Sequence, residues 1–272
     1  MTDDKNCAVL INSCDGYQDL WYPFFSLFYR FWPNCRYRVF LNAEHIPLVD
    51  GFPEVEVKNQ KESEPIPWGK RMRECLEEIE ENYVIILLDD FFLRKAVDSD
   101  KIAKCLDWLD SDPSTAVFYF QDTSEAFRRE FIDDGRYSGF ETAKKGAHYL
   151  MNLQAAVWRK SDLLNSLHDY DTPWTFEVLA SRYYSGMQKF RYLKPEEPRI
   201  IDYGFQMKGM GVFRGKWVES DVKPLFEQNG IQVDLSKRGI YKADVNPVIM
   251  LKNRMKLRIQ LIKYEKKYYK HH

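Results

Sequence analysis

"VIILLDDFFLRK", residues 84–95, is an apolar run that is broken by two adjacent carboxylates, Asp89 and Asp90. An unbroken run of this kind is typical of a strand that is buried on both faces. Burying a carboxylate costs free energy unless another group pairs with it. Either the strand ends at the two acids, which then lie at its carboxyl end, or a cation holds them.

The segments around this run alternate between strand and helix patterns. Strands are predicted at 7–14, 37–44 and 115–121 and within the apolar run 83–93, and helices at 17–33, 68–82 and 100–112. The polar, proline-bearing stretch 58–67 is predicted to be a loop. This order predicts an α/β fold with a mostly parallel central sheet flanked by helices.

Two polar clusters follow strands of this predicted sheet. Ser13 and Asp15 come after the first strand, and Asp89 and Asp90 come after the central apolar run. Ligands of such sheets bind outside the carboxyl ends of the strands. We therefore expect the two clusters to meet at one crevice.

The second half of the chain is less regular. Residues 122–148 are mixed and charged, and we expect a lid or an irregular excursion there. A strand running into a helix is predicted over 149–167. Pro173 and Glu177 mark a helix start, and short strands and turns are expected over 199–218.

Composition sets limits on the class of protein. The chain has 272 residues and is 44% hydrophobic, which is enough for one large domain with or without an appendage. Its net charge of −1 does not favour nucleic acid as a partner. The five cysteines are widely spaced, which argues against disulfides and zinc and favours reduced thiols in the cytoplasm. The polar residues 1–6 do not begin a secretory signal.

The stretch 252–272 is strongly basic, with eight lysines and arginines against the single acid Glu265. Apolar residues are interleaved with these cations. One interpretation is a basic amphipathic segment that lies on an anionic membrane surface, so that the protein is peripheral at the inner face of a membrane. The other is a solvated surface helix docked on the body of the protein.

Adjacent carboxylates at a strand end suit a hard divalent cation, Mn²⁺ or Mg²⁺. Such an ion takes one or two protein carboxylates and fills its shell with water and phosphate oxygens. A nucleoside diphosphate sugar would supply those oxygens, and the ion would stabilise the charge on the departing diphosphate. The alternative is that the acids cap the next turn or pair with Arg94 or Lys95.

Five segments, in order across residues 7–217, resemble bacterial GT-A-type glycosyltransferases of surface-polysaccharide (capsule or lipopolysaccharide) biosynthesis. They are "VLINSCDGYQDLWYPFFSLFYRFWP", "WGKRMRECLEEIEENYVIILLDDFFL", "NLQAAVWRKSDLLNSL", "TPWTFEVLAS" and "GKW". The resemblance implies a GT-A-like catalytic domain over about 1–220. Its nucleotide-binding part would be about 1–122 and its acceptor part about 123–220, followed by a C-terminal extension, 221–272, with the basic tail.

The resemblance also assigns roles on the donor side. Ser13, Asp15 and Tyr17 would contact the nucleotide base and ribose. Arg71, on the helix that Trp68 opens, would lie near the donor diphosphate, which a guanidinium binds as a bidentate fork. The alternative for Arg71 is an exposed helix charge.

Asp89 and Asp90 would form the metal motif, with Asp90 favoured as the direct ligand. Lys216, together with Arg214, would close over the diphosphate. Whether a third protein ligand exists stays open. Many members of the family complete the metal shell with a late histidine, for which His148 and His168 are the candidates.

On the acceptor side, Glu177 would be the catalytic base of an inverting transfer. The alternative is an acid at a helix N-terminus, where the helix dipole favours it. Trp174 would stack on a sugar ring, or belong to the core. Asn152 and Gln154 would line the acceptor site.

Three functions remain open on this basis. The leading one is metal-dependent transfer of a sugar from a UDP- or GDP-sugar to the hydroxyl of a free or lipid-linked saccharide. A sugar-nucleotide nucleotidyltransferase is disfavoured, because the loop "SCDGYQD" carries no cation for a triphosphate. A non-catalytic saccharide-binding or assembly subunit on the same fold is the third.

Overall fold

The computed structural model describes residues 6–122, 125–204, 210–242 and 247–269. Within these ranges nine strands form one sheet: β1 (Cys7–Asn12), β2 (Arg38–Ala43), β3 (Val55–Asn59), β4 (Tyr83–Leu88), β5 (Thr115–Asp122), β6 (Phe131–Ile132), β7 (Phe140–Ala143), β8 (Ala156–Arg159) and β9 (Lys189–Leu193). Their order across the sheet is β3-β2-β1-β4-β8-β5-β9-β7-β6.

The sheet is mostly parallel. Strands β3, β2, β1 and β4 form a parallel block, and β5 and β9 are parallel neighbours. Only β8 and β7 among these strands run in the opposite direction, since each is antiparallel to both of its neighbours. The predicted α/β class with a mostly parallel sheet is confirmed.

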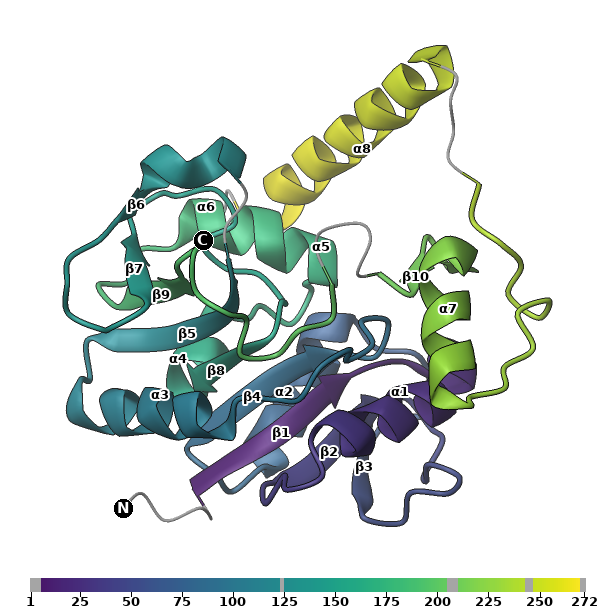
Figure 1. Cartoon of the computed structure of the whole chain (residues 1–272). Coiled ribbons are helices and arrows are strands. Elements are labelled where there is room, and N and C mark those ends of the chain that lie inside the picture. Colours follow the sequence, from purple (N-terminus) through teal and green to yellow (C-terminus); the bar gives the residue numbers. More distant parts are fainter. Residues whose placement is uncertain (1–5, 123–124, 205–209, 243–246, 270–272) are drawn as a thin grey trace.

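Helices cover both faces of this sheet (Figure 1). They are α1 (Gln18–Phe31), α2 (Trp68–Glu78), α3 (Ser99–Ser111), α4 (Lys160–Ser166), α5 (Pro173–Thr175), α6 (Ser181–Tyr183), α7 (Glu219–Asn229) and α8 (Pro247–Tyr268). The side chains of α1 and α3 pack on one face, and those of α2 and α4 pack on the other. A π-helical turn, Phe176–Ala180, joins α5 to α6.

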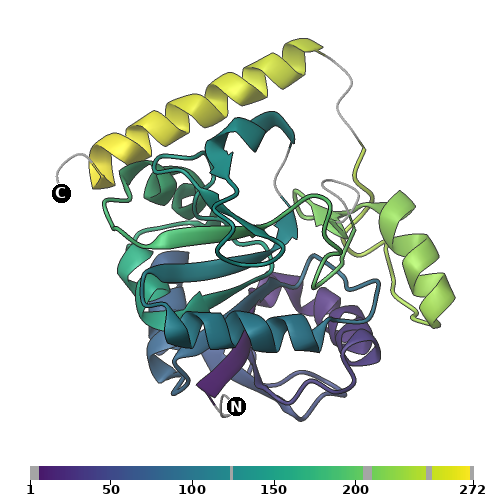
Figure 2. The same ribbon diagram turned by 60° about the vertical axis from the view of Figure 1, so that its left-hand side comes forward.

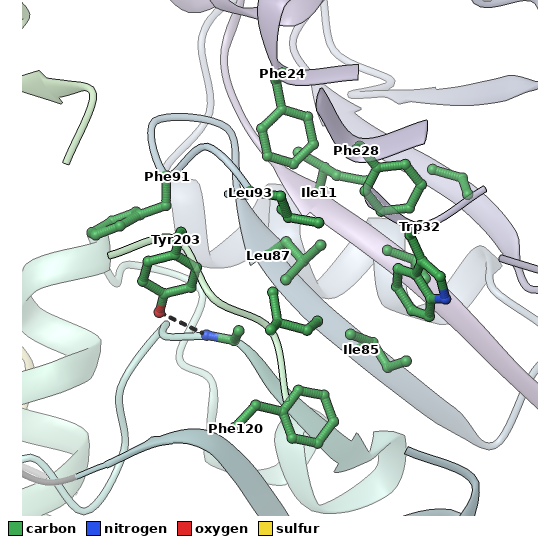
Figure 3. Close-up of a cluster of buried hydrophobic side chains, with 14 of the residues drawn as sticks. Ile11, Phe24, Phe28, Trp32, Ile85, Leu87, Phe91, Leu93, Phe120 and Tyr203 are labelled. Carbon is green, nitrogen blue, oxygen red and sulfur yellow. Dashed lines mark hydrogen bonds between the residues drawn. The ribbon is translucent and has the colours of Figure 1, made fainter. Parts of the chain in front are cut away.

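Strands β1 and β4 are apolar up to Ile11 and Leu88 because both of their faces are covered. In β1, Val9 and Ile11 belong to the core under α1, whereas Leu10 belongs to the core under α2. In β4, Ile85 and Leu87 repeat this pattern on the α1 side. Figure 3 shows Ile11, Ile85 and Leu87 beneath three aromatic residues of the α1 segment, Phe24, Phe28 and Trp32.

Several predicted boundaries change. The central strand ends at Leu88, directly before the two acids as their predicted place at its carboxyl end requires, and Asp89 and Asp90 form a turn. The predicted loop 58–67 is wrong at its start, because Lys58 and Asn59 pair with β2 as part of β3. The region 122–148 contains β6 and β7 at the sheet edge. Strand β9 was not predicted.

The C-terminal part packs back onto the same body. Helix α7 was not predicted, and its Phe226 packs on Phe92 and on Trp217 of the hairpin β10 (Val212–Phe213) and β11 (Lys216–Trp217). The hairpin confirms short strands within 199–218, although 205–209 lie outside the described residues. The predicted boundary at about 220 stays a prediction. The basic stretch 252–272 forms most of α8, and its residues 270–272 lie outside the described residues.

Asp112 organises the turn between α3 and β5. Its carboxylate is 4% exposed and accepts hydrogen bonds from Ser114 Oγ (2.5 Å), Thr115 Oγ1 (2.8 Å) and Tyr137 OH (2.7 Å). Burial by itself would raise the pKa of Asp112, but these hydrogen bonds outweigh it and hold the pKa well below its usual range. The ionised form therefore stabilises the folded state.

We expect Asp112→Asn to lower the free energy of unfolding at pH 7 by about 1–3 kcal/mol, because part of this network loses its charge-assisted acceptor. The pKa is lower in the folded state, so the wild-type contribution is present above the unfolded pKa of about 4 and is lost as pH falls. The difference between variant and wild type should shrink below that pH. Urea unfolding across pH measures this, with the exposed Asp107→Asn as control. A difference in free energy of unfolding between Asp112→Asn and wild type that does not change with pH would contradict this prediction.

Candidate active site

The two polar clusters meet at the carboxyl ends of β1 and β4. The register pairs Asn12 with Leu88, so the residues that follow these two strands lie side by side. Ser13 Oγ donates a hydrogen bond to Asp89 Oδ2 and accepts one from Trp21 Nε1 at 2.7 Å. Helix α1 therefore fixes the serine, and the serine fixes the first of the two acids.

The two acids share a poorly solvated turn. Asp89 is 4% exposed, and burial, followed by the charge of Asp90, raises its pKa well above the usual range. Burial raises the pKa of Asp90 to about 7. Two neighbouring carboxylates in such surroundings repel each other, and a bound cation would remove much of that cost.

The nearby cations of the chain have other partners. Arg94 pairs with Asp221, and Lys95 Nζ lies 2.9 Å from Asp202. The alternative that Arg94 or Lys95 neutralises the two acids is therefore wrong. Among the described residues no lysine or arginine forms an ion pair with Asp90.

Glu177 lies on the π-helical turn between α5 and α6. Its Oε1 accepts a hydrogen bond from the backbone N–H of Leu153 at 3.0 Å, and burial raises its pKa. The charge of Glu177 contributes to the raised pKa of Asp90, so the two carboxylates lie within electrostatic range of each other. Single π turns of this kind occur frequently at functional sites.

Tyr203 lies between the two sides of the site. Its ring packs on Phe91 with centroids 4.8 Å apart, and its hydroxyl donates to Gln154 Oε1. Figure 3 shows the ring beside Phe91, with the hydroxyl accepting from the N–H of Ala155. The charges of both Asp90 and Glu177 act on Tyr203. No sequence pattern pointed to this residue.

After residue 209 the chain passes beside Asp90. The N–H of Gly211 donates to the carbonyl of Asp90 at 2.7 Å. A Cβ at Gly211 would lie 2.1 Å from the ring of Phe92, so only glycine allows this approach.

Arg238 reaches the site from the segment after α7. Its guanidinium pairs with Asp19, donates to the carbonyl of Gly16 at 2.9 Å, and lies 4.5 Å from the ring centroid of Tyr17. Its charge opposes the rise in the pKa of both Asp89 and Asp90. Sequence reasoning missed Arg238, because nothing in its neighbourhood marks it.

Asp15 and Arg71 hold the loops at the ends of β1 and β2. The Asp15 carboxylate accepts hydrogen bonds from the backbone N–H groups of Glu44 (3.0 Å) and His45 (3.0 Å). Arg71 donates to the carbonyl of Ser13 at 3.0 Å and pairs with Glu44 at 3.3 Å. With 5% exposure, Arg71 is not the exposed helix charge of the alternative prediction.

The remaining predicted residues fall into two groups. Trp68 and Asn152 are tied into the body: Trp68 Nε1 donates to Asn12 at 3.0 Å, and Asn152 Nδ2 donates to Tyr192 OH at 3.0 Å. Trp174 is 36% exposed, and Lys216 is exposed on the hairpin beside Arg214.

The predicted histidines have other surroundings. His148 Nδ1 lies 2.7 Å from Glu130 Oε1, and His168 stacks on Tyr170. Within the described ranges no three histidines, cysteines or acids gather as a metal site. Asp89 and Asp90 therefore offer two carboxylates, which suits an ion that takes its other oxygens from a ligand.

Comparison with known proteins gives a distant likeness. No family model matches the sequence, and no curated protein is significantly similar to it. Among solved structures, S. aureus TarS is 9% identical with a TM-score of 0.44, over 70% of this chain and 60% of that chain. HddC from Yersinia pseudotuberculosis is 14% identical with a TM-score of 0.42, over 68% and 89% of the two chains.

An active-site mutant of LgtC is 13% identical with a TM-score of 0.39, over 68% of this chain and 72% of that chain. The present chain thus spans about 60% of the length of the TarS structure. At these identities and TM-scores the likeness carries no argument about the reaction, which has to be argued from the site itself.

Gly211→Ala should lower the free energy of unfolding by about 1–3 kcal/mol, because the new methyl group displaces the ring of Phe92 or the turn that bears Asp90. The matched control is Gly16→Ala, whose Cβ would meet its nearest neighbour, Cys14 Sγ, at an ordinary 3.9 Å. That control should change stability by less than about 0.5 kcal/mol. If urea unfolding shows that both variants lose the same stability, the close contact between Gly211 and Phe92 does not require a glycine.

Proposed function

We propose that this protein is a glycosyltransferase that moves a sugar from a nucleoside diphosphate sugar, UDP- or GDP-linked, to a saccharide hydroxyl. The observation that carries the proposal is the pair Asp89 and Asp90. Both are poorly solvated at the carboxyl end of β4, their pKa values are raised, and no described lysine or arginine pairs with Asp90. Such an arrangement is costly without a ligand and becomes favourable when a divalent cation is present.

Asp90, with Asp89 behind it, would hold Mg²⁺ or Mn²⁺ together with oxygens of the donor diphosphate. When bound, the ion would stabilise the negative charge that develops on the leaving diphosphate. Arg238 adds a second positive charge on this side of the site, and Lys216 on the hairpin would add a third. Tyr17, under Arg238, offers an aromatic surface near the end of β1.

Glu177 would act as the general base. The acceptor hydroxyl loses its proton to Glu177 as its oxygen bonds to the anomeric carbon, and the bond from that carbon to the diphosphate breaks on the opposite side. This route inverts the anomeric configuration. The pKa of Glu177 is raised by burial, which makes its carboxylate a better proton acceptor near neutral pH than an exposed glutamate.

Trp174 and Gln154 would form the acceptor side. The Trp174 ring is 36% exposed on the short helix that leads to Glu177, where it is available for stacking on a sugar. Gln154 is held by Tyr203, whose ring lies against the turn that bears Asp90. The acceptor would thus bind between the carboxylates of Asp90 and Glu177.

Metal-dependent nucleotide binding is the first test. Calorimetric titration of UDP and GDP, each with Mn²⁺, Mg²⁺ or EDTA, should show binding only with a cation. Asp90→Asn should weaken cation-dependent nucleotide binding. Loss of a residue that only supports a metal ligand costs about 10–100-fold in affinity, and loss of a direct ligand should cost more. Without ligand this variant should be at least as stable as wild type, since it removes a poorly solvated charge.

Asp107→Asn, an exposed acid on α3, is the matched control and should bind as wild type does. Cation-dependent binding of CTP in place of UDP and GDP would favour a nucleotidyltransferase. Absence of all nucleotide binding would favour the non-catalytic saccharide-binding subunit.

Glu177→Gln should lower kcat by about 10²–10⁴-fold while donor affinity stays unchanged, because the amide cannot take a proton. The amide oxygen can still accept the hydrogen bond from Leu153, so the fold should be kept. Initial rates with a radiolabelled donor measure the effect, and the exposed Glu227→Gln serves as control. A variant with wild-type kcat would remove Glu177 from the mechanism.

A further inference from the structure

The loop of residues 149–155 carries the backbone group that binds Glu177. The loop leads into β8 and belongs to no helix or strand. The N–H of Leu153 donates to Glu177 Oε1 at 3.0 Å. Ser181 forms a second link, because its Oγ accepts from the N–H of Met151 at 2.8 Å and donates to the carbonyl of Glu177 at 2.6 Å. The position of Glu177 therefore depends on the path of this loop.

Asn152 fixes the middle of the loop. Its amide Nδ2 donates to Tyr192 OH at 3.0 Å, and its Oδ1 accepts from the N–H of Gln154 at 3.0 Å. Its own N–H donates to Tyr119 OH at 3.1 Å. A buried loop without a strand or helix partner needs such side-chain partners for its backbone groups. Leu153 lies between the two backbone groups that are held in this way, so its N–H has a fixed direction.

Tyr119 and Tyr192 hold Asn152 from the central sheet. They lie on β5 and β9, which are parallel neighbours (Figures 1 and 2). The register pairs Tyr119 with Tyr192, and their rings stack with centroids 4.3 Å apart. Both side chains are buried, with 1% and 5% exposure. Two rigid strands therefore determine where the loop lies.

Tyr149, at the start of the loop, has a left-handed backbone conformation with a φ of +53°. This conformation is unfavourable for a residue that has a Cβ, whereas glycine adopts it readily. Tyr192 OH donates to the carbonyl of Tyr149 at 2.8 Å and so helps to keep the conformation in place. Backbone strain of this kind persists where the surrounding structure enforces it, and it concentrates at active sites.

We propose that Asn152 is a positioning residue that acts on Glu177 through the N–H of Leu153, and that Tyr192 holds Asn152 in turn. This inference rests on the proposed function, in which Glu177 is the general base. Leu153 binds Oε1 of the carboxylate, which leaves Oε2 to take the proton from the acceptor hydroxyl. Both ends of the Asn152 amide already have protein partners, so its role is to orient the base and not to contact the acceptor.

One titratable neighbour of Glu177 has to be controlled in a test. Among the described residues, the charge of Glu177 acts on the carboxyl of Asp90 and on the phenols of Tyr119, Tyr192 and Tyr203. Burial raises the pKa of each phenol above the ordinary value of about 10. Only Asp90 therefore titrates in the same range as Glu177, and Asp90→Asn removes that titration.

The first test measures the pKa of Glu177 by carbon-13 NMR of its side-chain carboxyl, in the full chain with Asp90→Asn and EDTA. The signal of Glu177 is the one that Glu177→Gln removes. Tyr192→Phe keeps the ring and Asn152→Leu keeps the branched shape, and both remove hydrogen bonds. Each should raise the pKa of Glu177 by about 1 unit, because the N–H of Leu153 then stabilises the ionised carboxylate less well.

Tyr137→Phe is the matched control. Tyr137 is also a buried tyrosine, and its hydroxyl donates to Asp112 at 2.7 Å. This control should lose stability in urea unfolding as Tyr192→Phe does, but it should leave the pKa of Glu177 unchanged. The proposal would be overturned if neither Tyr192→Phe nor Asn152→Leu shifts that pKa, or if the control shifts it equally.

The second test is kinetic and uses the chain with Asp90 intact. Tyr192→Phe and Asn152→Leu should each lower kcat by about 10–100-fold, because a small displacement of the base is costly, while the Kd of UDP or GDP with Mn²⁺ stays unchanged. In a Glu177→Gln background neither variant should lower kcat further, since both act through Glu177. A further loss in that background would indicate a general effect on the fold and would overturn the proposal.

The two tests separate this inference from the proposed function. A Glu177→Gln variant with wild-type kcat would refute the role of Glu177 as base, whereas the NMR titration would still decide whether Asn152 positions its carboxylate. A slow Glu177→Gln variant beside wild-type rates in Tyr192→Phe and Asn152→Leu would support the base and refute the positioning role.

Discussion

The structure around the site depends on two neighbouring carboxylates at the end of a central strand, of which Asp89 is buried and Asp90 partly buried. Asp89 is held by Ser13, which Trp21 holds in turn, so β1, β4 and α1 meet at one hydrogen-bonded chain. The unfavourable charge is kept in place by the apolar core beneath it, where Leu87 and Ile85 of β4 pack against α1. A well-packed scaffold of this kind can hold a group in a costly environment, and such groups concentrate at functional sites.

The residues around the acids divide into those that shape the site and those that remain available. Arg71 and Asp15 are engaged with the loops after β1 and β2, so their contribution is to fix these loops beside the two acids. Trp174 and Lys216 are exposed. The buried side chains therefore determine geometry, while the exposed ones can contact a ligand without losing a structural partner.

The C-terminal segment completes the site from a distance. Gly211 binds the carbonyl of Asp90, and Arg238 bridges Asp19 and Gly16 across more than 200 residues of sequence. The same segment contributes Trp217 and Phe226 to the core beside Phe92. Packing and electrostatics thus couple the end of the chain to the turn that carries the two acids.

The sequence by itself determined the strands and helices of the first 121 residues other than β3, and the place where β4 meets its acids, because periodic burial is a local property that residue spacing records. It also indicated that Ser13 and Asp89 would meet, since strands of a parallel sheet end at one edge. Only the tertiary structure decided which charges lie together. Arg238 and Tyr203 reach the site through chain returns that no local pattern encodes, and strand β9 takes its place by pairing with β5 far from it in sequence. Such contacts depend on the free energy of the whole packed arrangement, to which each local segment contributes only a part.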